Sequence, residues 1–220
     1  MRICPRFSQE VIGMKLIFDQ YVFETFQIES VEGRMTAIQE RIQPLFRYYG
    51  EEIQKLLAEQ GLSQPIHIAK HLRRKTHPAP NTWVAIGGDK RGYKKYPHIE
   101  LGINPEYVFI TLSIIDQPLN EIEIAQGFSQ MTTQFQNLPS DIIIIPDHTQ
   151  IAFIKQDEAD YHIILNRLET VKKAEFMIGR LAFNGEERLQ NQEAISSWIR
   201  DTLLEIMPFY LAALKISRTP

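Results

Sequence analysis

The sequence has one cysteine, Cys4, and no hydrophobic run long enough to cross a bilayer. One cysteine cannot form an intramolecular disulfide, and an extracellular chain of this size more often carries a bridged pair, so a reducing, cytoplasmic location is expected. The longest apolar runs, Tyr107–Ile115 and Ile206–Leu214, reach about half of the ~20 residues that a membrane-spanning helix needs. We therefore expect no membrane segment.

Several catalytic signatures are also missing: the patterns GxxxxGK[ST], GxGxxG, HExxH and GxSxG do not occur. Walker-type nucleotide hydrolysis, zinc-protease chemistry and an activated serine therefore have no candidate motif. The chain also lacks a large charge surplus, because 24 basic and 27 acidic residues give a net charge of -3. Since the whole molecule is no polycation, any role in binding nucleic acid must be local.

What is present is the composition of an ordinary globular domain, with 220 residues of which 44% are apolar and 23% charged. Residues 1–13 show no periodicity, and Gln9-Glu10-Val11 can be encoded by a ribosome-binding sequence upstream of Met14. We expect residues 1–13 to be a non-native leader or a disordered native tail. Residues 14–220 are expected to form a single α+β domain.

Apolar residues recur in steps of three and four from Ile28 to Leu57, which predicts a long helix that Pro44 kinks or breaks. Further helices are predicted at about 124–138, at 161–171 and from Asn191 onward, the last bent at Pro208. Trp83 and Trp198 are interpreted as core residues. The stripe on the long helix should be buried: Met35, Ile38, Ile42, Leu45 and Tyr49.

Stretches rich in β-branched and aromatic residues predict strands at 82–86, 97–103, 107–115, 142–145 and 175–183. Short connections make the first three antiparallel neighbours. The sequence thus predicts one mostly antiparallel sheet packed by helices.

A basic segment runs from Lys70 to His98, with eight Lys or Arg residues against one acid, Asp89. Its local charge of +7 leaves -10 on the rest of the chain, which suits an anionic partner such as a phosphate, a polycarboxylate or a nucleic-acid backbone. A solvated loop kept soluble by charge is the alternative. The candidate ligand-binding residues are Lys70, His71, Arg73, Arg74, Lys90, Arg91, Lys94 and His98.

The segment contains two charged strings, HIAKHLRRK and GDKRGYKKYPHI, in which Tyr93 and Tyr96 add flat faces. The chain between them can fold back, so we expect Arg74 and Arg91 or Lys94 to approach a shared concavity. A zinc site on the histidines of this region is weakly supported, because no cysteine or HExxH glutamate accompanies them and the adjacent cations oppose it. No metal or other cofactor is expected. The histidines considered are His67, His71, His77 and His98.

Asp147-His148-Thr149 follows the apolar strand IIIIP, and polar groups just past a buried strand often line a cleft. An Asp-His pair can tune a general base. The alternative is a turn in which Asp147 bonds to local backbone.

The segments IESVEGRMTAIQERIQPLF, HIAKHLRRKTHPAPNTWVAI, KRGYKKYPHIELGI, PDHTQ and RLETVKKAEF occur in this order. In this the chain resembles the YktB-like family of uncharacterised bacterial proteins from about residue 18 to 215. The resemblance implies a cytoplasmic α+β domain and a start near Met14, and it brings no activity, cofactor or catalytic residue. His77 stands where the family pattern has asparagine.

Three functional hypotheses remain open. The first is a module that binds an anionic ligand through the basic surface. The second is an enzyme that acts on a phosphorylated or carboxylated small molecule, with His148 or His71 as general base, and the third is a structural or interaction protein. A deep cleft that joins His148 to the basic turn would favour the enzyme, and a broad convex patch would favour contact with nucleic acid or protein.

Overall fold

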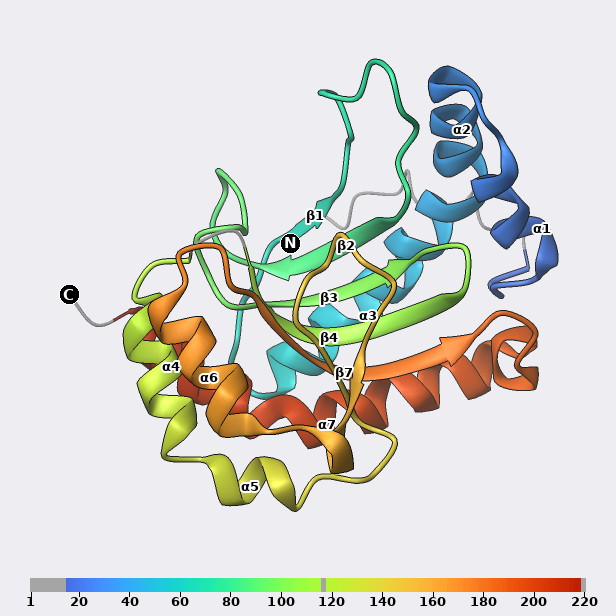
Figure 1. Cartoon of the computed structure of the whole chain (residues 1–220). Coiled ribbons are helices and arrows are strands. Elements are labelled where there is room, and N and C mark those ends of the chain that lie inside the picture. Colours follow the sequence, from blue (N-terminus) through green and yellow to red (C-terminus); the bar gives the residue numbers. More distant parts are fainter. Residues whose placement is uncertain (1–14, 116–117, 219–220) are drawn as a thin grey trace.

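The computed structural model describes residues 15–115 and 118–218, and the expectation for residues 1–13 lies outside these ranges. The described residues form a seven-stranded sheet packed by helices, as the α+β prediction requires (Figure 1). The strand order is β1-β2-β3-β4-β7-β5-β6, and every neighbouring pair is antiparallel. The strands are β1 (Ile66–Ile68), β2 (Thr82–Gly87), β3 (His98–Ile103), β4 (Tyr107–Ile114), β5 (Ile143–Ile145), β6 (Ile154–Lys155) and β7 (Phe176–Phe183).

The helices begin at polar caps where the sequence offers them. Ser30, Asp160 and Asn191 each accept a hydrogen bond from the backbone N–H three residues later, which satisfies a first-turn donor. The α-helices are α1 (Gln20–Phe23), α2 (Val31–Ala37), α3 (Gln43–Glu59), α4 (Glu121–Ser129), α5 (Thr132–Gln136), α6 (Tyr161–Thr170) and α7 (Gln192–Ser217).

The long helix predicted at 28–57 is present as α2 and α3, joined by a π-helical turn at Ile38–Ile42. Pro44 lacks an N–H and its ring crowds the preceding turn, so the wider turn lies where a kink was expected. The predicted stripe is fully buried except for Met35. Met35 stays half-buried because it lines an open cavity beside α2.

The other predictions of secondary structure need two corrections. The helix predicted at 124–138 is divided into α4 and α5, where the Thr132 hydroxyl donates to the Ser129 carbonyl. The five predicted strands are confirmed to within one residue at each end. Strands β1 and β6 were missed because IHI and IK contain no uninterrupted β-branched run, whereas the isoleucine run at 142–145 indicated β5, which is equally short.

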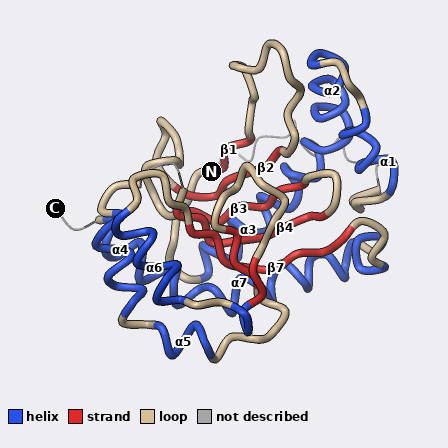
Figure 2. The backbone as a smooth tube through the Cα atoms, viewed as in Figure 1, coloured by secondary structure: helices blue, strands red, loops and turns tan. Residues whose placement is uncertain are grey.

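The two faces of the sheet differ in what covers them. Val84 and Ile86 of β2 lie in the main core with α3 and α7, and a Cβ added at Gly50 of α3 would lie 3.4 Å from a methyl carbon of Val84. The opposite face is covered largely by the loops before β2, before β3 and after β5 (Figure 2). We call it the loop-covered face. A second apolar cluster, which includes Tyr107, Phe109 and Met177, occupies its β4–β7–β5 end.

Candidate functional site

A cluster of rings on the loop-covered face is centred on Trp83 of β2. The indole lies edge-on to His71 and His148, with centroid distances of 5.5 and 6.0 Å. Its Nε1 donates a hydrogen bond of 2.8 Å to the hydroxyl of Tyr93. Trp83 is half-buried and lies away from the main core, so its interpretation as a core residue was wrong, whereas Trp198 is buried in that core.

Tyr93 extends this cluster to two more histidines. Its ring centroid lies 4.7 Å from that of His98 and 5.7 Å from that of His67. His98 is fully buried and its Nδ1 lies 2.8 Å from the carbonyl oxygen of Tyr96. Burial lowers the pKa of His98 to about 4, so this imidazole is neutral at physiological pH.

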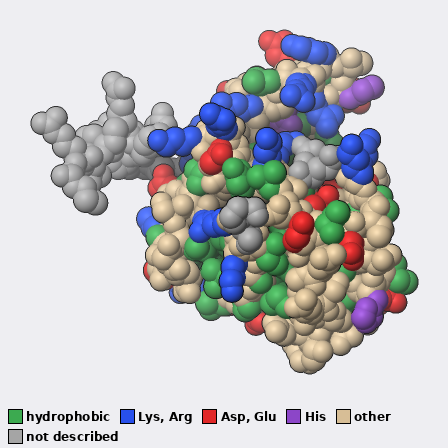
Figure 3. All heavy atoms as spheres, turned by 90° about the vertical axis from the view of Figure 1, so that its left-hand side faces the viewer, with side chains coloured by type: hydrophobic (Ala, Val, Ile, Leu, Met, Phe, Trp, Pro, Cys, Tyr) green, Lys and Arg blue, Asp and Glu red, His purple; other side chains and the backbone are tan. Residues whose placement is uncertain are grey.

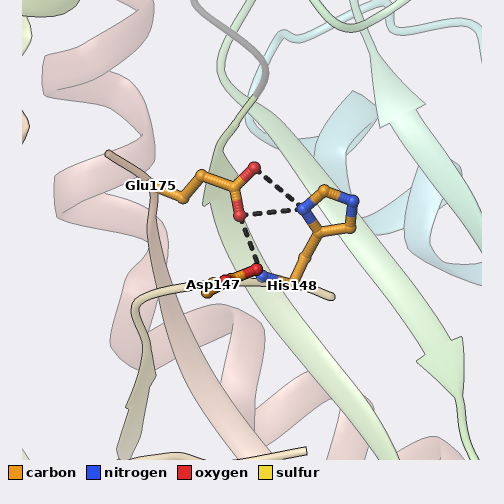
Figure 4. Close-up of side chains that lie close together, drawn as sticks. All are labelled: Asp147, His148 and Glu175. Carbon is orange, nitrogen blue, oxygen red and sulfur yellow. Dashed lines mark hydrogen bonds and ion pairs between the residues drawn. The ribbon is translucent and has the colours of Figure 1, made fainter. Parts of the chain in front are cut away.

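His148 is held in place by three of its polar groups (Figure 4). Its Nδ1 lies 2.8 Å from both carboxylate oxygens of Glu175, and its backbone N–H donates to the same carboxylate at 2.8 Å. The side chain of Asn81 donates to the His148 carbonyl at 2.9 Å. The hydrogen bond to Glu175 raises the pKa of His148, and partial burial opposes this shift. With Nδ1 engaged, Nε2 lies on the far side of the ring, over the strands (Figure 4).

Asp147 bonds within a local turn, as the alternative interpretation of Asp147-His148-Thr149 expected. Its Oδ1 accepts hydrogen bonds from the backbone N–H and the hydroxyl of Thr149, at 2.9 and 2.6 Å. The acid that orients His148 is therefore Glu175, which lies just before β7 and 27 positions away in the sequence. Nothing near His148 in the sequence pointed to it.

Potential metal ligands come together at the same place. Within the described ranges, Asp147, His148 and Glu175 are the one group of three such residues whose ligand atoms lie within 4.8 Å of one another. Hydrogen bonds engage Nδ1 of His148, both carboxylate oxygens of Glu175 and Oδ1 of Asp147, an arrangement that fits an oriented imidazole. The histidines considered for zinc form no such group in this part of the chain.

A buried carboxyl, Glu100 of β3, lies in the same layer. It is 1% exposed, and the Ser113 hydroxyl donates to it at 3.0 Å. Burial raises the pKa of Glu100 to about 7, while the nearby charge of His148 lowers it. A carboxyl in this setting exchanges its proton near neutral pH.

The basic segment surrounds a cavity of about 590 Å³ between β1 and the turn at residues 88–97. We call it the basic cavity. Lys70 follows β1, and the other three lining cations come from the turn. Lys and Arg side chains gather over the upper part of this side of the molecule, with hydrophobic side chains between them (Figure 3). The lining cations are Lys70, Arg91, Lys94 and Lys95.

Asp89, the acid of this segment, is engaged by the turn itself. Its Oδ1 accepts from the backbone N–H groups of Arg91 and Gly92, at 2.7 and 3.2 Å, and its Oδ2 accepts from the Tyr96 hydroxyl at 3.0 Å. Gly88 has a φ of +80°, and a Cβ there would collide with the backbone of Gly92. The close turn that presents the cations therefore requires glycine.

The remaining candidate residues lie elsewhere. His71 and Arg74 line a second cavity, of about 410 Å³, between α2 and the loop after β1, and Lys70 lines both cavities. The expected meeting of Arg74 with Arg91 or Lys94 was thus wrong, because Lys70 is the cation of the first string that lines the cavity beside the turn. Arg73 and Lys90 are exposed and line neither cavity, and His98 lies beneath Tyr93.

His71 is a poor general base in this structure. Its Nε2 lies 3.1 Å from the Thr82 hydroxyl, and burial together with the charge of Arg74 lowers its pKa to about 4. His148 is the better placed of the two histidines proposed for that role.

Comparison with known proteins shows which family the chain belongs to. Residues 18–210 match the family model described as a domain of unknown function, DUF1054. The chain belongs to this family. A UPF0637 protein of Enterococcus faecalis is 39% identical over 202 residues, which cover 90% of this chain and 98% of the relative. A UPF0637 protein of Listeria monocytogenes is 37% identical, with the same coverage of both chains.

The family match confirms the resemblance to uncharacterised bacterial proteins, and it covers every residue named in the two cavities. None of the helices in the described ranges is long and apolar enough to cross a membrane. The DUF1054 description names no substrate or reaction. Function must therefore be argued from the geometry above.

Proposed function

We propose that the protein binds an anionic small molecule, one that carries a phosphate or carboxylate group, in the basic cavity. One observation carries the proposal: two basic strings that are separate in the sequence supply four cations around a single cavity. Close like charges repel one another, and an anion between them relieves that repulsion. The cytoplasmic location expected from the single cysteine is part of this proposal.

The charges that line the basic cavity also support an anionic ligand. Among the described residues, Lys70, Arg91 and Lys95 form no ion pair. Among the lining residues that lie in the described ranges, Asp89 is the one acid, and the backbone of the turn and Tyr96 already bond to it. This balance of described lining charges favours an anionic ligand.

A thermal-shift assay tests the proposal. Sodium phosphate or sulfate should raise Tm more than sodium chloride does at equal ionic strength. Arg91→Glu should remove that difference, because it reverses one charge in the cavity. Arg47→Glu is the matched control, since Arg47 is exposed on α3, away from the cavity.

Two results would overturn the proposal: equal Tm shifts in phosphate and chloride, or an anion response that Arg91→Glu leaves unchanged. If a nucleic-acid backbone is the partner instead, affinity for duplex DNA should fall by about 0.9 log units per log unit of salt for each phosphate neutralised.

An enzyme is the second candidate, favoured by the hydrogen bonds that orient His148. Lys94 lines the basic cavity, and its charge acts on the pKa values of His148 and Glu100. His148 itself is not part of the lining, so the binding function is preferred. Hydrolysis of p-nitrophenyl phosphate, abolished by His148→Gln while the phosphate-induced Tm shift remains, would favour the enzyme.

A further inference from the structure

We infer that the ligand of the basic cavity is a nucleoside phosphate, whose base packs against the tyrosines while its phosphate meets the cations. This inference rests on the proposed function and adds to it the class of ligand. Its basis is the other half of the lining, which consists of rings and aliphatic groups rather than charges: His67, Ile68, Tyr93, Tyr96 and Leu119.

The two tyrosine rings of the cavity are held by hydrogen bonds of their hydroxyl groups, one within the lining and one to β2. The Tyr96 hydroxyl donates to Asp89 at 3.0 Å, and the Tyr93 hydroxyl accepts from Trp83 at 2.8 Å. The Tyr93 ring also packs edge-on to buried His98. Because these bonds fix where the rings lie, a planar ligand loses less free energy in ordering them. Stacking on an aromatic side chain is favourable for all four bases, because each base has a flat π-face.

His67, one of the lining residues, has an unpaired polar atom beside the cavity. Its ring lines the cavity, and its Nε2 is a buried atom with no hydrogen-bond partner among the described residues. Buried polar atoms of native proteins are nearly always paired, with protein, water or ligand. An imidazole nitrogen can donate to or accept from the edge of a base, depending on its tautomer.

The size and charge of the cavity select a small ligand. At about 590 Å³ it falls within the roughly 300–1,000 Å³ typical of sites for small molecules. A dicarboxylate or an inorganic anion would satisfy the cations but would not stack on the rings of the lining. A sugar phosphate would offer no flat apolar surface to Tyr93 or Tyr96. A nucleoside phosphate satisfies both halves of the lining.

The same chemistry occurs in a free nucleotide and in the terminal nucleotide of single-stranded RNA, so the experiment includes both. Isothermal titration calorimetry measures the wild-type chain with AMP, GMP, CMP and UMP, with ribose 5-phosphate, with inorganic phosphate and with a 5′-phosphorylated hexanucleotide. At least one mononucleotide should bind about tenfold or more tightly than ribose 5-phosphate, as favourable stacking of the base implies. A free nucleotide is the ligand if the hexanucleotide binds no more tightly than the mononucleotide.

Three variants test which lining residues cause the preference for a nucleotide over ribose 5-phosphate. Tyr96→Ala should remove most of the advantage of the nucleotide over ribose 5-phosphate, and Tyr96→Phe should retain it because the ring remains. Arg91→Ala should weaken both ligands by a similar factor. Tyr21→Ala is the control, since Tyr21 is an exposed tyrosine that does not line the cavity.

The outcomes separate this inference from the proposed function. If ribose 5-phosphate and inorganic phosphate bind as tightly as every nucleotide, the inference is overturned and the anion site stands. If no anion binds, both are overturned. A nucleotide preference that survives in Tyr96→Ala and in the matching Tyr93→Ala also overturns the inference.

Discussion

The helix-covered and loop-covered faces of the sheet are built from the same strands, yet they carry different chemistry. In β3, Ile99 and Leu101 point into the core under the helices, while His98 and Glu100 point under the loops. Both pairs are buried, so burial alone does not distinguish a face that stabilises the fold from a face that holds reactive groups. Protein stability should therefore depend on side-chain volume at the helix-covered face and on pH at the loop-covered face.

The largest effect is expected on the helix-covered side. Ile42 is fully buried in the main core, and Ile42→Ala removes three methyl or methylene groups and leaves a cavity. The free energy of unfolding, measured by urea denaturation, should fall by ~2–5 kcal/mol. Ile163→Ala is the control, since Ile163 is 67% exposed on α6 and its truncation should change stability little. An equal loss in both variants would contradict the assignment of this core.

Glu100 tests the other face. Its pKa is raised from 4.5 to about 7, so between these values the unfolded chain has released the proton that the folded chain retains. Stability contributed by this group is therefore lost as pH rises from 4.5 to 7. Glu100→Gln should increase the free energy of unfolding at pH 8, by roughly 3 kcal/mol at most, with a smaller change at pH 4.5. A variant that is less stable than wild type at pH 8 would show that the carboxylate is required there.

The smallest effect is expected at the hydrogen bond between Glu175 and His148. Because the pKa of His148 is raised in the folded protein, its contribution to stability is fully present below pH 6.5 and is lost as pH rises through the folded pKa. Glu175→Gln should lower the pKa of His148, followed by NMR of the imidazole, and should reduce stability more at pH 6 than at pH 9. An unchanged imidazole titration would mean that Glu175 does not orient this ring in solution.

The two faces also differ in how far the sequence predicts them. Runs rich in β-branched and aromatic residues placed five of the strands to within one residue, and the stripe from Ile38 to Tyr49 defined the buried side of the long helix. Trp83 was assigned to the wrong side because apolar character alone does not say which face of β2 a side chain occupies. The neighbours Val84 and Ile86 set the register, and Trp83 alternates with them.

The sequence predicted the charge of the candidate site, but it predicted only some of the residues that lie together there. Clustered cations pointed to Lys70, Arg91 and Lys94, which line one cavity. The position of Arg74 was predicted wrongly because His71 adopts a positive φ of 48° and begins a turn that includes Arg74. The residue types around His71 did not predict this turn. Glu175 meets His148 only because β7 pairs with β5, and pairing between distant strands leaves no signal in a single sequence.

The order of the strands has a consequence for synthesis. β7 is the last strand to leave the ribosome, yet it pairs with β4 on one side and β5 on the other. Until residue 183 has emerged, the earlier described strands form a four-stranded piece, β1–β4, and a two-stranded piece, β5–β6, and the edges of β4 and β5 that β7 joins stay unpaired. α7, which packs against β4 and β7, emerges later still. A nascent chain of this protein therefore depends on its final third to join its halves, and premature termination there would leave two edges exposed for aggregation.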